Sequence, residues 1–301
     1  MNLYYLLLPL LGLLWTLVAI IISEARQHNI KITYFYLTGS ILSALLLLAV
    51  NIRTGIASFF HAQCRITILC FAFGAVFNGM GQAISMANLR QNGRALAYSI
   101  PLLAFLLPYF WSVFFWSQHF SWQAGTGLLI IIAAILFLTM KKDLPLQNSA
   151  NSTLPFYRVM IAVAAMIIIG IGQVLMAIPT QFPKEQTLSP WAGASLIQIV
   201  NAIFFLIWIL VEGHNSFKEL KRACRFGLFW GICAAASFCV LFFALRALGE
   251  MQQAGIVFPT GCSITILLYS IFTSLRFREK LTWSQYLAFI LVSVGIFLIK
   301  L

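Results

Sequence analysis

Residues 64–142 read CRITILCFAFGAVFNGMGQAISMANLRQNGRALAYSIPLLAFLLPYFWSVFFWSQHFSWQAGTGLLIIIAAILFLTMKK, and the chain repeats this pattern in residues 224–301. Three pairs fix the alignment, at offsets of 160, 158 and 161 residues: Cys64 with Cys224, Pro101 with Pro259, and Trp122 with Trp283. A long repeat whose offset drifts by only a few residues indicates one ancestral unit with small loop insertions. The two copies therefore predict two similar structural units in one chain.

The composition excludes a soluble domain. Of the 301 residues, 61% are hydrophobic and 9% are charged, and the mean hydropathy is +0.95, whereas soluble domains carry about 25% charged residues. We therefore expect an all-α integral membrane protein that crosses a lipid bilayer several times. The net charge of +12 is spread thinly between apolar runs, as in the loops of membrane proteins, and this argues against nucleic-acid binding.

Ten apolar runs are long enough to span a bilayer, which takes about 20 residues. They cover residues 3–22, 32–51, 65–87, 95–117, 122–140, 155–178, 189–211, 224–245, 252–274 and 282–300. The predicted division is a first five-helix repeat in residues 1–142, a polar linker in 143–154 and a second five-helix repeat in 155–301. Because five is odd, the second repeat begins on the opposite side of the membrane and is inverted relative to the first. Inverted repeats with a substrate site near the midplane are typical of secondary transporters.

The end of the second copy, residues 251–301, reads MQQAGIVFPTGCSITILLYSIFTSLRFREKLTWSQYLAFILVSVGIFLIKL. Pro259 lies early in a helix after a short turn, and Glu279 precedes the final apolar helix. In these features the chain resembles the drug/metabolite transporter superfamily, in its EamA-like ten-helix branch. The resemblance implies ten transmembrane helices, transport of a small molecule and, as the location, the inner or plasma membrane of a bacterium. It leaves the substrate open.

Acidic residues lie at or near the ends of the predicted runs: Glu24, Asp143, Glu185, Glu212, Glu219, Glu250 and Glu279. A charge at the bilayer centre costs at least ~2.5 kcal/mol and normally marks coupling or ion passage. Small four-helix multidrug relatives in the resembled superfamily use a membrane-embedded glutamate in their first helix, and the first run here contains none. The first copy also has Gln118-His119 where the family usually has a glutamate. Coupling is therefore predicted not to depend on a carboxylate at mid-membrane.

The basic residues give no single answer on orientation. Fourteen of the nineteen lie in the odd-numbered connections and five on the other side. The positive-inside rule then puts both termini outside, whereas the ten-helix proteins that the chain resembles usually have both termini inside. The two arguments disagree, so the sequence leaves orientation open, and it leaves the oligomeric state open as well.

Polar side chains recur on single faces of several predicted helices. Amides and hydroxyls are spaced i, i+4, i+7 in the third run, and two amides lie one turn apart in the seventh. The predicted substrate-binding residues are Asn78, Gln82, Ser85, Tyr98, Tyr109, Gln173, Gln198, Asn201, Thr260 and Ser263. The resemblance places them at mid-depth between the third, fourth, sixth, seventh, eighth and ninth runs. The alternative for each is an interhelical hydrogen bond that only holds helices together.

These patterns predict a secondary transporter that moves a small polar metabolite, of the amino-acid, sugar or cofactor-precursor class, by alternating access. Amides offer donors and acceptors without net charge, which favours a neutral or zwitterionic solute. The alternatives are a multidrug or cation exporter and a non-transporting accessory membrane subunit. We expect no enzyme, because the sequence has no Ser-His-Asp set, phosphate loop or paired buried carboxylates. We expect no cofactor and no metal site, because the histidines show no ligand spacing and no CxxC pair occurs.

Overall fold

The structure is a computed structural model that describes residues 3–52, 59, 61–89, 101, 103–116, 121–139, 156–213, 216–277 and 283–300. These residues form ten α-helices and contain no β-strand: α1 (Leu7–Gln27), α2 (Ile32–Asn51), α3 (Arg65–Leu89), α5 (Leu106–Phe115), α6 (Trp122–Thr139), α7 (Phe156–Ala177), α8 (Pro190–Glu212), α9 (Phe217–Gly249), α10 (Val257–Phe277) and α11 (Trp283–Lys300). Short 3-10 turns lead into four of them: η1 (Leu3–Leu6), η3 (Ala62–Cys64), η4 (Leu103–Phe105) and η7 (Ala254–Ile256). The all-α prediction is confirmed.

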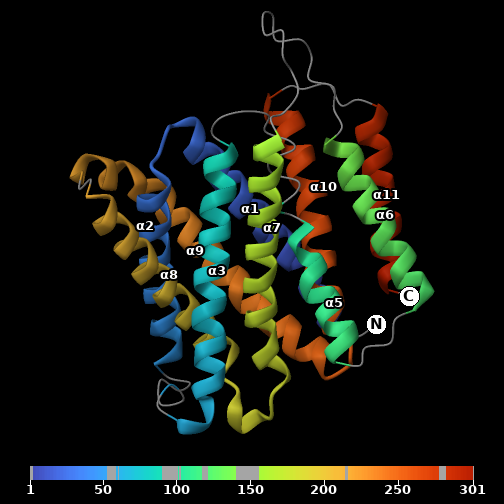
Figure 1. Cartoon of the computed structure of the whole chain (residues 1–301), viewed down its shortest axis with the longest axis horizontal. Coiled ribbons are helices and arrows are strands. Elements are labelled where there is room, and N and C mark those ends of the chain that lie inside the picture. The colour runs from blue at the N-terminus through green and yellow to red at the C-terminus, as the bar shows by residue number, and fades with distance from the viewer. Residues whose placement is uncertain are drawn as a thin grey trace, which may run out of the picture.

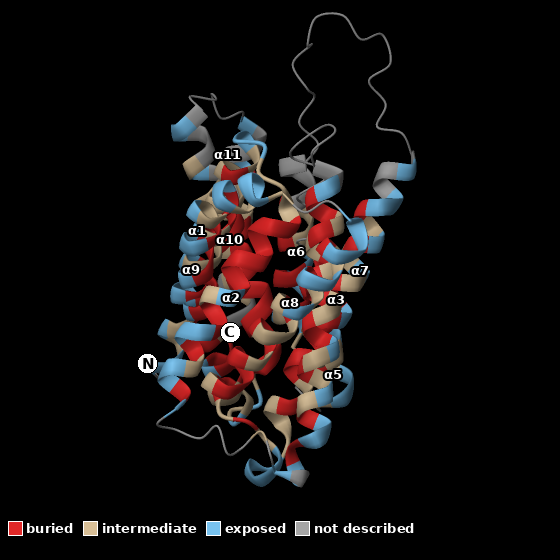
Figure 2. Cartoon of the chain, turned by 90° about the vertical axis from the view of Figure 1, so that its left-hand side faces the viewer, coloured by how far each residue is buried: buried red, intermediate tan, exposed pale blue. Residues whose placement is uncertain are grey.

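Within the described part of the chain, six helical segments are long and apolar enough to cross a membrane: Leu3–Gln27, Ile32–Asn51, Arg65–Ala87, Met160–Gln181, Lys184–Glu212 and Phe217–Gly249. Their outward faces are apolar, as α8 illustrates with Ile203, Leu206 and Leu210 exposed at 51%, 45% and 60%. Figure 2 shows exposed positions on the outside of the bundle and buried ones within. An apolar exterior of this extent fits an integral, multi-pass membrane protein. The remaining four of the ten predicted spans stay a prediction.

Capping residues set several helix boundaries. The Ser189 side chain accepts a hydrogen bond from the backbone N–H of Ala192 at the start of α8, where Pro190 occupies the first turn. Gly213 ends α8 in the left-handed conformation, with φ of 65°. Ser216 caps α9 in the same way as Ser189 caps α8, by accepting from Glu219. The run predicted at 224–245 is therefore too short, because hydropathy does not register the polar, basic first turns of α9.

The helices stand side by side in one bundle, with α8 at one edge and the α6–α11 pair at the opposite edge (Figure 1). The principal contacts between the two halves are α3 with α7, α2 with α9, α6 with α11, α2 with α8, α1 with α9, α1 with α10, α3 with α8, and α5 with α7. The helices of the two halves correspond in chain order: α1, α2, α3, α5 and α6 to α7, α8, α9, α10 and α11. If every helix in this set of contacts is replaced by its counterpart, in both directions, the same set of contacts results. The two halves therefore use corresponding helices to contact each other.

Glycines allow the closest helix contacts. On α9, a Cβ added to Gly231 would lie 2.5 Å from the backbone oxygen of Gly39 on α2, and one added to Gly227 would lie 2.0 Å from the Thr38 hydroxyl oxygen. Neither distance is tolerable, so only glycine lets the two backbones approach this closely. This contact fixes α2 and α9 side by side and determines which residues face α8.

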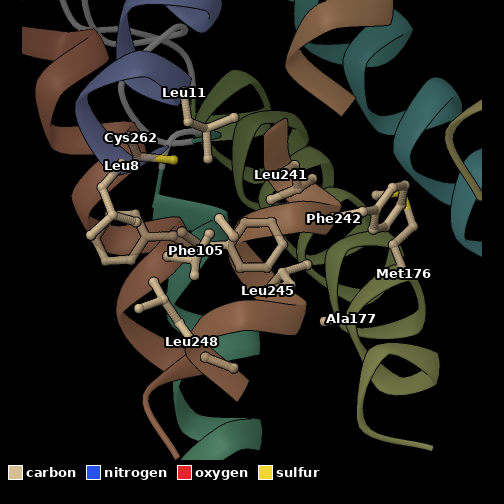
Figure 3. Packing of buried hydrophobic residues seen from close by; sticks show 14 of the residues in the cluster. Leu8, Leu11, Phe105, Met176, Ala177, Leu241, Phe242, Leu245, Leu248 and Cys262 are labelled. Carbon is tan, nitrogen blue, oxygen red and sulfur yellow. The ribbon is translucent and has the colours of Figure 1, made fainter. Parts of the chain in front are cut away.

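Apolar side chains fill the interior in two clusters. The larger one joins α1, α5, α9 and α10, and Figure 3 shows Leu11, Phe105, Leu245 and Cys262 converging within it. The smaller one joins α2, α3, α8 and α9 around Tyr36. Close packing of these side chains provides many favourable dispersion contacts and fixes the helices relative to one another. The polar groups considered below lie beside the smaller cluster.

Candidate functional site

Helices α2 and α8 pack antiparallel. Lys31 Nζ, just before α2, lies 2.7 Å from Glu212 Oε2 at the end of α8. Farther along, the Tyr36 and Phe205 rings stack with centroids 5.0 Å apart and 16° between their planes. Residue numbers rise along α2 as they fall along α8, which defines the antiparallel register.

Continuing this register brings polar residues to the same level. One turn beyond Tyr36 and Phe205, Ser40 of α2 lies level with Asn201 of α8, and a further turn brings Ser43 level with Gln198. At 1.5 Å per residue, Ser40 and Asn201 lie about 14 to 17 Å along the helices from the ion-paired ends. These residues therefore sit near the middle of two helices that are each long enough to cross a membrane.

The polar groups at this level are buried without hydrogen-bond partners among the described residues. Gln198 is 0% exposed, and neither its Oε1 nor its Nε2 has a partner. The Oδ1 of Asn201, which is 5% exposed, and the hydroxyls of Ser40 and Ser43 are in the same condition. An unpaired buried donor or acceptor costs about 1–3 kcal/mol, so packing alone does not account for this set.

Helix α3 closes the next side of the cluster. A Cβ added to Gly79 would lie 2.9 Å from Asn201 Oδ1, so the glycine lets the amide lie directly against the α3 backbone. Asn78, at 6% exposure, is the preceding residue on α3, and Gln82 is half-buried one turn on. Four of the sequence-predicted amides therefore lie on α3 or α8: Asn78, Gln82, Gln198 and Asn201.

An aromatic layer separates the polar cluster from the ion-paired end. The Tyr36 hydroxyl donates to Met86 Sδ on α3 at 2.7 Å, and the Tyr36 ring meets Trp230 of α9 edge-on with centroids 5.2 Å apart. Phe35 packs on Trp230 at 5.8 Å. The indole Nε1–H of Trp230 is buried and has no partner in the described structure, and the benzene edge of the indole lies against α2 at Gly39.

Charged groups lie at the ends of these helices. Burial only partly covers the Lys31–Glu212 pair, whose side chains are 27% and 33% exposed. The hydrogen bond from Lys31 to Glu212 raises the pKa of the lysine above its ordinary value, so the lysine is charged at neutral pH. A second ion pair joins Arg276 of α10 to Glu24 of α1 at 3.5 Å. Both pairs link the first half of the chain to the second.

The predicted site residues divide between two regions. Gln198 and Asn201 of α8 belong to the polar cluster, whereas Asn78, Gln82 and Ser85 lie on the neighbouring helix α3, where the backbone of Asn78 lies against Gly172 of α7. Gln173 lies on α7, a helix that packs on α3 as α8 does. The Oε1 of Gln173 is buried without a partner in the described part of the chain.

The other predicted residues lie elsewhere. Tyr109 packs into the larger apolar cluster. Thr260 and Ser263 are buried on α10, which packs on α1 through a hydrogen bond of 3.2 Å from Thr265 to the Gly12 carbonyl. Tyr98 lies outside the described residues. The structure therefore brings Gln198 and Asn201 together beside α3 and does not place Tyr109, Thr260 and Ser263 with them.

Sequence reasoning missed Ser40 and Ser43. A signal was present, since Tyr36, Ser40 and Ser43 have the i, i+4, i+7 spacing of one helical face. The predicted cavity between the halves is not open at the amides, because Gln198 is fully buried. A small hollow, of about 20 Å³ and so large enough for one water, lies instead near the start of α8, lined among others by Phe71, Ser189 and Arg246.

Comparison with known proteins supports the fold. No family model matches the chain, and no curated protein matches it. Twenty-six chains of solved structures match. One, a crystal structure described only as that of a protein, has a TM-score of 0.72 and 13% sequence identity over 99% of this chain and 98% of that one. At this identity the likeness establishes a shared fold: an all-α architecture that extends over the whole chain.

Proposed function

We propose that the chain is a secondary transporter that moves a small polar metabolite across a membrane by alternating access. The observation that carries this proposal is Gln198: a complete side-chain amide, fully buried at mid-helix, with no partner for either polar atom among the described residues. In a membrane interior such groups are expensive and mark a functional path. A polar ligand that pairs with them removes the cost, which gives the site its binding energy.

The packing pattern supports ten membrane spans in two inverted five-helix repeats. Contacts between the halves follow an exchange of corresponding helices. Under that exchange α2 corresponds to α8, and these two helices run antiparallel, as inverted repeats require. Transporters with this organisation bind substrate between the repeats near the bilayer midplane, which is the level of Asn201 and Gln198. The organisation also agrees with the resemblance to the EamA-like branch and with a bacterial inner or plasma membrane.

A transport cycle follows from the arrangement. The Lys31–Glu212 and Glu24–Arg276 pairs and the aromatic layer around Tyr36 hold one end closed. Their separation opens the amides toward that side, and separation of α3, α8 and α9 at the other end opens them toward the opposite side. The amides of Gln198 and Asn201 bind the solute by hydrogen bonds in both orientations. Rocking of one repeat against the other then carries it across.

A cation exporter is the weaker alternative. The acidic residues that the structure describes, Glu24, Glu185, Glu212, Glu219 and Glu250, lie in end turns, at caps or between helices. None of them stands level with the amides, so a cation there meets no counter-charge. An accessory membrane subunit without transport activity would retain the fold but have no use for unpaired amides at mid-depth.

A ligand-stabilisation screen on the purified protein tests the proposal. A panel of amino acids, sugars and cofactor precursors is scored by the rise in melting temperature, because a ligand that binds only the folded state stabilises it. Compounds that bind are then used in uptake assays with protein reconstituted in liposomes. Gln198→Leu and Asn201→Leu are expected to weaken binding at least tenfold. Gln123→Leu, the same kind of change at an exposed position on α6, serves as the matched control.

Two results count against different parts of the proposal. Uptake that is unchanged in both amide variants leaves the chain a transporter but rejects Gln198 and Asn201 as its binding site. Absence of binding and of uptake for the whole panel points to an accessory subunit.

A further inference from the structure

The free polar atoms at mid-depth include both donors and acceptors. Gln198 offers an NH2 group and a carbonyl oxygen, and Asn201 offers Oδ1. The hydroxyls of Ser40 and Ser43 each donate and accept. A carboxylate only accepts hydrogen bonds, so it would leave the two amide oxygens unpaired, and an ammonium only donates them, so it would leave the Gln198 NH2 group unpaired. A ligand hydroxyl both donates and accepts, and it can pair with every member.

The site also lacks countercharges. On α2, α3 and α8 the charged residues are Lys31, Arg65 and Glu212, all at helix ends, and Lys31 and Glu212 already neutralise each other at 2.7 Å. On α9, Arg225 lies five residues before Trp230 and is exposed. A zwitterion enclosed at the amides would bury two charges without partners, which is strongly unfavourable. The ligand therefore carries no charged group, which excludes a zwitterion as well as an ion.

The aromatic rings beside the cluster pack on one another. Tyr36 stacks on Phe205 with centroids 5.0 Å apart, and Phe205 also stacks on Trp208 at 6.2 Å. Tyr36 and Phe35 each meet Trp230 in a T-shaped contact, at 5.2 and 5.8 Å. Proteins that bind flat bases offer free aromatic faces, whereas the rings here are engaged with neighbouring rings, which disfavours a flat heterocycle.

We infer that the ligand of this site is an uncharged polyhydroxy compound, a sugar or a polyol, held by Gln198, Asn201, Ser40 and Ser43. This inference rests on the proposed transport function and narrows its substrate class. Sites that hydrogen-bond a ligand hydroxyl reject analogues that lack it, because the buried protein groups are then left unpaired. The site should therefore discriminate between a sugar and its deoxy analogue more sharply than between sugars of different length.

The test measures binding by the full-length protein in lipid nanodiscs. The polyhydroxy probes are D-glucose, D-ribose, D-mannitol, myo-inositol and glycerol; the zwitterionic probes are L-alanine, L-serine and L-glutamine; the heterocyclic probes are uracil and nicotinamide. Binding is followed by calorimetry and by the rise in melting temperature. The variants are Gln198→Leu and Ser43→Ala. Ser237→Ala is the control, because the Ser237 hydroxyl is equally buried but already donates to the Ala234 carbonyl at 2.9 Å.

The expected result is saturable binding of at least one polyhydroxy probe. Its dissociation constant should rise at least tenfold in Gln198→Leu and in Ser43→Ala, and stay within twofold of wild type in Ser237→Ala. Removal of one hydroxyl from that probe should weaken binding at least tenfold. Ser43→Ala deletes a single atom, so it remains informative if the Gln198 variant fails to fold.

Other outcomes overturn the inference and separate it from the transport proposal. Binding of a zwitterionic or heterocyclic probe that depends on Gln198 rejects the polyhydroxy class but leaves a polar-metabolite transporter in place. Polyhydroxy binding that is unaffected by both variants moves the site elsewhere and rejects the assignment. Failure of every probe to bind, together with no flux in liposomes for the same compounds, rejects the inference and the proposed function together.

Discussion

The Gln198→Leu substitution should make the protein more stable while it removes binding. Leucine has nearly the same size as glutamine and no polar atoms. In the wild type both polar atoms of Gln198 are buried without a partner. The substitution therefore relieves two unpaired groups at a fully buried position.

The magnitude follows from two opposing effects. Each unpaired buried polar group costs about 1–3 kcal/mol, and an isosteric change in a packed interior costs up to about 1.5 kcal/mol through imperfect fit. The expected net gain is about 2 kcal/mol in the free energy of unfolding. The measurement is reversible unfolding in mixed micelles, with the ligand absent.

Two controls identify the cause of the change. Gln123→Leu makes the same kind of replacement at an exposed site on α6 and should leave the free energy of unfolding within about 0.5 kcal/mol. Ser237→Ala removes a hydroxyl that has its hydrogen bond and should cost about 1 kcal/mol. If Gln198→Leu instead lost more than 1 kcal/mol, the amide would have partners in the folded protein, and the argument for a ligand site at this level would fail.

Three further outcomes test the surroundings of the site. Lys31→Met should lower the free energy of unfolding by about 0.5–1 kcal/mol, as expected for a partly exposed ion pair. Because the pKa of Lys31 is raised above 10.5, the lysine's contribution to stability is complete below that pH and is lost only as the pH rises through the folded-state pKa. The difference in melting temperature from wild type should therefore be constant between pH 6 and 9, and a steady decline across that range would contradict the assignment. Gly231→Ala should cost about 1–3 kcal/mol through overpacking against the Gly39 carbonyl, measured by unfolding, and an unchanged value would show that α2 and α9 are not in close contact. Gly79→Ala should leave stability within about 1 kcal/mol, because the Asn201 amide can rotate away, yet weaken ligand binding about tenfold; unaffected binding would place the Asn201 amide outside the site.

Hydropathy predicted the helices well wherever a helix is apolar from end to end. The runs 32–51 and 189–211 differ by at most one residue at each end from α2 and α8. It failed at the start of α9, where Ser216 caps a first turn that is polar and basic. A hydropathy window reports transfer to lipid, whereas a helix extends as far as its backbone hydrogen bonds and caps allow. Apolar runs therefore locate helices better than they locate helix ends.

The site was harder to predict because spacing along a helix does not show which hydroxyls are satisfied. Thr38 and Ser40 lie two residues apart on α2, and both are buried. The Thr38 hydroxyl donates to the Tyr34 carbonyl one turn back, at 2.9 Å, as such residues often do in helices. The Ser40 hydroxyl has no partner among the described residues. The sequence gives no reason to treat the two differently.

The spacing of polar residues along a helix also shows which of them share one face of that helix, but it does not show which other helix packs against that face. Ser263 and Gln198 both satisfied the requirement for a polar residue on an inward face, yet α10 packs on α1 while α8 packs on α2. Which helices meet is decided by contacts far apart in the sequence, such as that between Gly39 and Gly231. The amides on α8 were found because two lay one turn apart, and the α2 hydroxyls opposite them required the antiparallel register.

The unpaired groups also bear on how the proposed cycle is driven. In a conformation open to either side, water reaches Gln198, Asn201 and Ser43 and satisfies them. In the closed conformation they are buried, so a bound polar solute is what supplies the missing hydrogen bonds. The bound solute therefore favours the closed state, because it pairs with these groups where water cannot reach them. A transporter built in this way closes readily around its solute and poorly when empty.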